Sequence, residues 1–206
     1  MRPSREFFSK GIVWLFFELT IVFVGVMLAF FVSSWRSDQV DKTRAIRTLR
    51  ILESELADFT TYGPHAHTRI LAALDTFEQK LEAGDFPVPA YYREPRASTS
   101  PVEAWKAVVQ SGAYELLDDS LFYAMSLHYN RVVHFNAQYM RYTLETEDIV
   151  MPYIDGPTQF FYEPNSNRLR SEYRWHVRQL EEVSEELSLL LAEAAVMQEK
   201  LQRQIK

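Results

Sequence analysis

The sequence predicts an all-α protein in which one N-terminal transmembrane helix continues into a membrane-proximal helical bundle with long amphipathic helices. The stretch from Gly11 to Trp35 carries a single charged residue, Glu18. Beyond it, apolar residues recur every three or four positions, a spacing typical of helices that bury one face. Most glycines and prolines fall at residues 84–101 and 152–164, where we expect loops.

The composition limits the class of protein. A chain of 206 residues with 47% hydrophobic residues can form one ordinary domain and an appendage. It contains no cysteine, which excludes disulfides, thiolate metal sites and a cysteine nucleophile. Residues 51–206 hold 24 acidic and 14 basic residues, a net charge of −10. We therefore expect no nucleic-acid partner, because phosphate binding needs clustered basic residues.

A basic tail, residues 1–10, precedes the apolar segment, residues 11–35. The first 23 positions of this segment would form a helix about 34 Å long, enough to cross a hydrocarbon core of about 30 Å. Trp14 and Trp35 lie near its two ends, where indole rings favour the membrane interfaces. A cleavable signal peptide is the alternative, but the segment is too long and lacks a small-x-small cleavage site. We expect an uncleaved anchor in the lipid bilayer.

Basic residues flank both ends of the apolar segment, so they define its orientation weakly. The short tail holds Arg2, Arg5 and Lys10, whereas five basic residues follow Trp35 and are spread along a predicted helix. A short basic tail beside the first span is the stronger signal. It favours a cytoplasmic N-terminus with the soluble domain on the outer side.

Glu18 is an ionisable residue within the predicted span. An ionised carboxylate at full depth in lipid costs on the order of 2 to 3 kcal/mol, so it should be neutral, paired or turned toward another helix. Gly25 and Ala29 lie seven and eleven positions further on, roughly on the same face, and small residues four apart let helices approach closely. These residues predict helix packing in a homo-oligomer. The alternatives are a carboxylate that reaches back to the interface and a chance G-x-x-x-A.

The predicted bundle domain covers residues 36–206. We expect the membrane helix to continue into it unbroken, because no glycine or proline occurs between Val26 and Tyr62. Tyr62-Gly63-Pro64 should end that helix, and the irregular stretch at residues 85–99 should pack on the bundle or on a neighbour. The predicted helices are residues 36–61, 65–83, 101–111, 119–150 and 167–205.

Helix starts and apolar stripes support these ranges. Ser100 and Glu103 match a capping box with a proline between them, and Asp118 or Asp119 should cap the next helix. The last helix has heptad spacing over about 38 residues, so either the first soluble helix or another copy should lie against it. The longest stripes are Leu121, Met125, His128, Val132, Phe135, Tyr139, Tyr142, Thr146 and Ile149, and Tyr173, His176, Leu180, Val183, Leu187, Leu190, Ala194, Met197 and Leu201.

No residue pattern indicates catalysis, a cofactor or a metal site. The chain has no GxSxG, phosphate-binding loop or dinucleotide glycine motif, so we expect no enzyme activity, no catalytic residues and no cofactor. His65 and His67 are two residues apart and His128 and His134 are six apart, and neither spacing places a pair on one helical face. The glutamate runs near residue 182 are typical of a solvated helix surface.

Two stretches of the chain carry a family resemblance, 18-ELTIVFVGVMLAFFVSSW-35 and 104-AWKAVVQSGAYELLDDSLFYAMSLHYN-130. They resemble the DUF6090 family, a domain of unknown function in uncharacterised bacterial single-span membrane proteins. The chain departs from the family at Ser33-Ser34-Trp35-Arg36, where the family reads Asn-Asn-Trp-Asn. The resemblance implies a single-pass protein of the bacterial inner membrane, with a soluble domain that we expect in the periplasm, and supports the importance of Glu18. It implies no activity.

We expect a non-enzymatic, homo-oligomeric, membrane-anchored scaffold or interaction protein. An oligomeric cation or proton channel lined by Glu18 is the first alternative, although the apolar neighbours of Glu18 argue against a wide aqueous pore. The second alternative is a ligand sensor in which the aromatic loop at residues 86–92 and the tyrosine-rich helix form a pocket. Such a sensor would act through a membrane partner protein.

Overall fold

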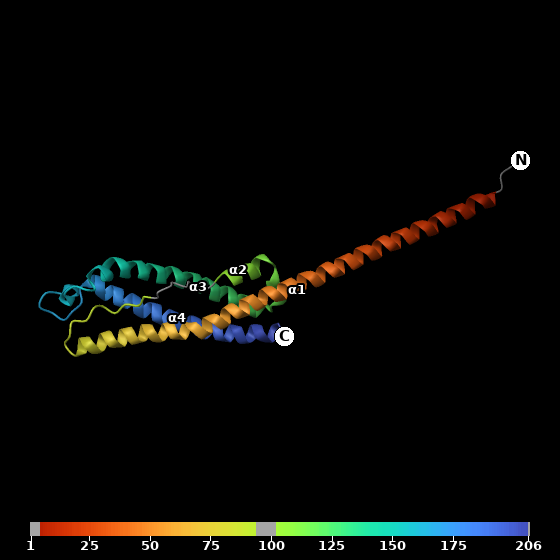
Figure 1. Ribbon diagram of the computed structural model, residues 1–206. Coiled ribbons are helices and arrows are strands. Elements are labelled where there is room, and N and C mark those ends of the chain that lie inside the picture. Colours follow the sequence, from red (N-terminus) through yellow and green to blue (C-terminus); the bar gives the residue numbers. More distant parts are fainter. Residues whose placement is uncertain (1–4, 94–101, 206) are drawn as a thin grey trace. The chain divides into compact units, whose positions relative to one another are not determined.

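The computed structural model describes residues 5–93 and 102–205, with side chains for Trp14 and for every described residue from Phe17 onward. This part of the chain is helical and contains no β-strand, which confirms the all-α class. It divides into two compact units, Met1–Arg44 and Ala45–Lys206. The elements are α1 (Arg5–Glu82), α2 (Glu103–Gln110), η1 (Ala113–Leu116), α3 (Asp119–Glu145), η2 (Thr146–Val150), η3 (Met151–Tyr153), η4 (Thr158–Phe161) and α4 (Ser171–Gln204) (Figure 1).

Helix α1 continues through Pro64, so the predicted break at Tyr62-Gly63-Pro64 is wrong. A proline inside a helix costs about 3 kcal/mol, because it removes a hydrogen bond and clashes with the preceding turn. Tertiary packing on both sides offsets this cost, since Leu56 and Ile70 are both buried. Pro64 itself lies on the exposed side of the helix. The helix-breaking tendency of Gly63-Pro64 is therefore outweighed here by the burial of a continuous apolar stripe.

Helix α2 begins at Glu103, and its N-cap residue is Val102, which provides no side-chain cap. The predicted capping residue Ser100 lies outside the described residues. A carboxylate from another helix caps α2 instead: Glu55 Oε2 of α1 accepts a hydrogen bond from the Ala104 backbone N–H at 3.2 Å. Glu103 forms an ion pair with Lys106 at 2.7 Å rather than capping the helix.

Helix α3 begins as expected, because Asp118 Oδ1 accepts a hydrogen bond from the Leu121 N–H at 2.8 Å. The regular helix ends at Glu145, and the predicted last turn is the π-helical η2. Helix α4 begins at Ser171, four residues later than expected. The preceding chain forms a short hairpin instead, with a bridge between Tyr162 and Leu169.

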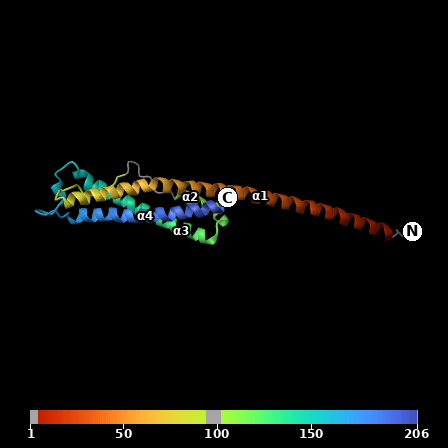
Figure 2. The same cartoon turned by 90° about the horizontal axis from the view of Figure 1, so that it is seen from below.

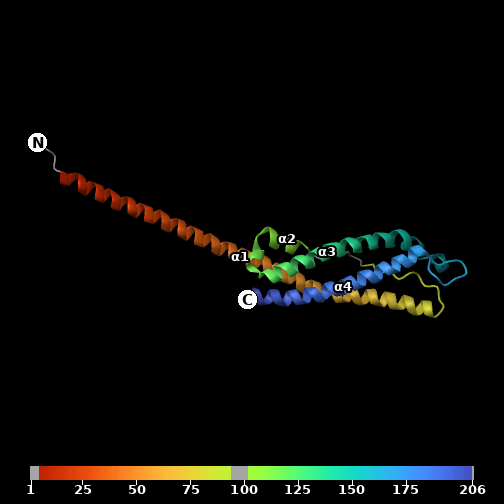
Figure 3. The same cartoon turned by 180° about the vertical axis from the view of Figure 1, so that it is seen from behind.

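In the unit Ala45–Lys206, α3, α4 and the last part of α1 lie side by side (Figures 1, 2 and 3). Buried residues of these three helices form two core clusters, and α2 contributes to one of them. The stripe of α4 is therefore covered by helices of the same chain, which leaves it no need for a second copy. The first cluster includes Ile70, Leu74, Phe77, Val132, Phe135, Tyr142, Leu180, Val183 and Leu187, and the second includes Leu49, Leu52, Leu56, Trp105, Leu121, Met125, Met197 and Leu201.

The loop after α1 packs on this unit, as the sequence analysis expected. The ring of Phe86 meets the ring of Tyr162 edge-on, with centroids 5.0 Å apart. The Tyr162 hydroxyl donates a hydrogen bond to the Pro87 carbonyl at 2.7 Å. Further along, the Tyr92 N–H donates to the Tyr142 hydroxyl at 3.0 Å. The described part of the loop is thus held by α3 and by the η4–α4 connection.

Candidate functional site

The apolar segment of α1 is exposed along its whole described length. Its large apolar side chains between Phe17 and Trp35 are 48% to 73% exposed. Within the described residues, α1 is the one helix long and apolar enough to cross a membrane. Its most apolar 18-residue window has a mean hydropathy of 2.1 and is not buried at all. Monomeric soluble proteins rarely expose so large an apolar surface, so this surface needs a bilayer or a protein against it.

The five predicted site residues, Trp14, Glu18, Gly25, Ala29 and Trp35, lie on this segment. Glu18, Gly25 and Ala29 are exposed on α1, and their spacing places them near one face. A Cβ built on Gly25 would meet no atom within 4 Å, so packing inside this unit does not require a glycine there. Trp14 and Trp35 are also exposed.

A charged cluster joins α3 and α4 in the other unit. The Arg131 guanidinium donates to Glu186 Oε1 at 2.9 Å and also contacts Glu193. The buried His128 lies beside them, with its Nδ1 3.2 Å from Glu193 Oε2. Burial lowers the pKa of His128, and the hydrogen bond with Glu193 opposes this effect. The cluster fixes the pairing of α3 with α4, because its two glutamates lie two helical turns apart on one face.

A second polar cluster lies where α3 passes into η2. The Thr146 hydroxyl donates to the Tyr142 carbonyl at 2.8 Å, so His176 Nε2, 2.8 Å away, must donate to Thr146 Oγ1. The His176 ring is stacked on the Tyr142 ring at 4.8 Å. His176 Nδ1 has no hydrogen-bond partner among the described residues. Burial lowers the pKa of His176 to about 4, and the ring is therefore neutral at pH 7.

Glu55 is a third partly buried polar residue. Besides capping α2, its Oε1 lies 3.4 Å from the Tyr129 hydroxyl. Burial is the main cause of its raised pKa, which the hydrogen bond from the Ala104 N–H partly offsets. Its surroundings are those of a structural cap that joins α1, α2 and α3.

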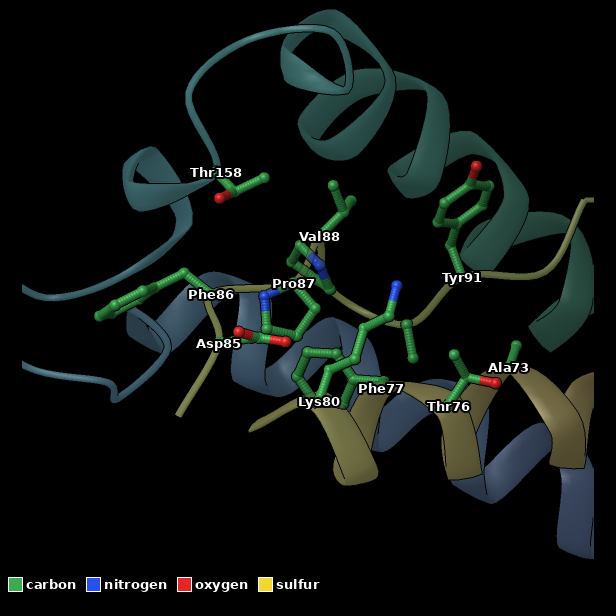
Figure 4. Close-up of a pocket in the computed structure, with 12 residues that line it drawn as sticks. Ala73, Thr76, Phe77, Lys80, Asp85, Phe86, Pro87, Val88, Tyr91 and Thr158 are labelled. Atoms are coloured by element: carbon green, nitrogen blue, oxygen red, sulfur yellow. The ribbon is translucent and has the colours of Figure 1, made fainter. Parts of the chain in front are cut away.

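A cavity of about 640 Å³ lies between the last turns of α1 and the aromatic loop. Figure 4 shows Phe77 at its base and the Lys80 side chain pointing into it, with Val88 and Tyr91 around the amine. Thr158 reaches the cavity from η4. The cavity volume is in the usual range for small-molecule sites, about 300 to 1,000 Å³. The sequence predicts a pocket between this loop and the tyrosine-rich helix, whereas α1 and η4 form the walls opposite the loop in this cavity.

The described residues offer no group of three or more histidine, aspartate or glutamate side chains that could hold a metal ion. The sequence places His128 and His176 on apolar stripes and gives the pair His128 and His134 no metal-binding spacing, but it does not predict the polar partners of His128 and His176. Arg131, Glu193 and Glu55 each lie 49 or more residues from the partners they contact. A single sequence carries no signal for such pairs beyond their positions near the stripe.

No protein-family model matches the chain, and no curated protein or solved structure is similar to it. The resemblance to the DUF6090 family therefore remains a prediction from the sequence. The candidate sites must be judged by their own geometry and chemistry.

Proposed function

We propose that this protein is a non-enzymatic, membrane-anchored scaffold that assembles from several copies in the bacterial inner membrane. The observation that carries the proposal is the apolar segment of α1, which is exposed wherever its side chains are described and bears one acidic residue, Glu18. The segment is long enough to cross the hydrocarbon core. The N-terminus lies on the cytoplasmic side and the soluble unit in the periplasm.

The acid supplies the reason for assembly. In hydrocarbon, the Glu18 carboxylate is costly unless it is neutral, paired or turned toward protein. The described residues of this chain include no second helix that could cross the membrane beside Glu18, so its partner is another copy or another membrane protein. Gly25 and Ala29 near the same face allow two helices to approach closely. The open space around Gly25 supports this role, because nothing within its own unit uses it.

The soluble unit serves as the interaction part of the scaffold. It has core clusters of its own, and α3 exposes a row of apolar side chains that neither cluster covers. Val133, Met140 and Leu144 follow one another at steps of seven and four, so they lie on one face of α3. Such a face suits a protein partner.

Native mass spectrometry of the full chain in mild detergent tests the assembly. We expect one defined oligomer for the parent. The double variant that combines Glu18→Gln and Gly25→Leu should shift toward monomer, and the exposed control Asp38→Asn should not change the oligomer. A monodisperse monomer for the parent would contradict the proposal. Proton or cation flux into liposomes that Glu18→Gln removes would instead assign the oligomer as a channel.

The cavity beside the aromatic loop favours a second candidate function, a ligand sensor that acts through a membrane partner. Its Lys80 amine and apolar walls could hold a small molecule (Figure 4). Mass spectrometry of small molecules that co-purify with the chain tests this candidate. We expect a compound that the parent retains and that Ala73→Trp, which fills the cavity, does not. Equal retention by both proteins would contradict it.

A further inference from the structure

A second cavity, of about 670 Å³, opens between the end of α1 and the start of α4. Its apolar wall is formed by Phe77 and Leu81 of α1, by Val177 and Trp175 of α4, and by Leu169, which precedes α4. Phe77, Val177 and Leu169 belong to the first core cluster, so they hold fixed positions. Half of the Trp175 side chain is exposed. The wall therefore offers a rigid apolar surface that is open to a ligand.

Three arginines and one glutamate provide the charges of this cavity: Arg168, Arg174, Arg178 and Glu181. Its positive excess contrasts with a chain whose net charge is −6. The cavity beside the aromatic loop differs, because it has one lysine and one aspartate, Lys80 and Asp85. The cavity at the start of α4 thus combines apolar walls with an excess of cationic groups.

The arginines are not neutralised by strong ion pairs. Arg168 Nε lies 3.9 Å from Glu163 Oε1, and Arg178 Nε lies 3.4 Å from Glu182 Oε1. Both pairs are exposed, and such pairs contribute little. Arg174, between them in the sequence, forms no ion pair within the described residues. Its guanidinium group can give a carboxylate two parallel hydrogen bonds.

We propose that this cavity binds a small soluble carboxylic acid with an apolar body, such as a medium-chain fatty acid or an aromatic acid. Arg174 binds the carboxylate, Arg168 and Arg178 add positive potential, and the apolar body lies against Phe77 and Trp175. The cavity volume is sufficient for a ligand of this size.

The acidic residues around the cavity favour a single negative charge on the ligand. Glu181 lies on the cavity wall, and Glu78, Glu182 and Glu185 lie near enough to raise its pKa, although burial is the larger cause. A ligand with two or three charges would meet their repulsion. The bound acid would join the end of α1 to the start of α4 and so hold these two helices together.

Tryptophan quenching in the full chain tests the proposal, with the protein in nanodiscs of zwitterionic lipid and 4-bromophenylacetate as the probe. A bromine atom quenches an indole ring that it contacts. We expect saturable quenching that Trp175→Phe removes. Because a charge-assisted hydrogen bond contributes about 1.5 to 3 kcal/mol, Arg174→Gln should weaken binding by roughly tenfold or more, while Arg174→Lys should restore part of it.

Two controls make the result specific. Arg203→Gln removes an exposed arginine that pairs with Glu199 four residues away, as Arg178 pairs with Glu182, and it should leave binding unchanged. The neutral 4-bromophenethyl alcohol should bind at least tenfold more weakly than the acid. Equal quenching by the alcohol, or unchanged binding in Arg174→Gln, would overturn the proposal. So would quenching of Trp175 by brominated anionic lipid without competition from the soluble acid, because the cavity would then hold a lipid headgroup.

Discussion

Acid should destabilise the soluble unit through His176, and His176→Phe should remove that part of the effect. The folded-state pKa of His176 is about 4, against 6.5 for an unperturbed histidine, because its ring is buried. Below pH 6.5 the imidazole of His176 binds a proton in the unfolded chain but stays neutral in the folded chain. Stability is therefore lost as the pH falls from 6.5 to 4. The loss is 1.36 kcal/mol per pH unit, or roughly 3 kcal/mol in total.

Urea unfolding of the full chain in mild detergent, measured at several pH values between 4 and 7.5, checks this magnitude. Phenylalanine keeps an aromatic ring against Tyr142 but cannot take up a proton. Between pH 7 and pH 4, the parent should therefore lose about 3 kcal/mol more unfolding free energy than His176→Phe loses. The other titrating groups, among them His128, are common to both proteins and cancel. Parallel curves for parent and His176→Phe would refute the reasoning.

Three further predictions concern packing and orientation. Leu180→Ala, at a fully buried position, should cost about 2 to 5 kcal/mol of unfolding free energy. Leu189→Ala, on the exposed side of the same helix, should cost under about 1 kcal/mol. Similar losses for the two variants in urea unfolding would contradict the assigned core. Gly63→Ala should change the free energy of unfolding by less than about 1 kcal/mol, because the added Cβ would meet only the movable end of the Leu191 side chain and alanine is about 1 kcal/mol more favourable than glycine inside a helix. A loss above about 2 kcal/mol in urea unfolding would show that Leu191 cannot move aside. The chain has no cysteine, so a single introduced cysteine can be labelled alone. Tyr62→Cys, at an exposed position, should react with a membrane-impermeant maleimide in intact spheroplasts. Labelling only after permeabilisation would reverse the proposed orientation.

Apolar spacing predicted the buried faces well, because burial is the main constraint on which residues a helix places inside. All nine residues of the predicted α4 stripe are buried. In the stripe that runs through α3 and η2, seven of the nine residues are buried, and Tyr139 and Ile149 are partly buried. Helix ends were predicted less well. They depend on groups from elsewhere in the chain, such as the Glu55 carboxylate that caps α2.

The break expected at Pro64 shows the limit of local rules. Glycine followed by proline ordinarily ends a helix, but the conformational preference of one residue is small beside the burial of a long stripe. Gly63 instead lies inside the helix, against the end of the Leu191 side chain of α4. The cavities also depend on residues distant in the sequence. Phe77 and Trp175 meet at one of them only because the chain returns antiparallel to α1.

The central claim is that copies of this chain pack in the membrane through the face of α1 that bears Glu18. Disulfide cross-linking in native membranes tests it most directly. The chain has no cysteine of its own, so any cross-link must form through the introduced one. Cysteine at Gly25 or Ala29 should give rapid cross-linked dimers. Cysteine at Met27, which lies on the opposite face of the helix, should not. Equal cross-linking at all three positions, or cross-linking at Met27 alone, would contradict the account.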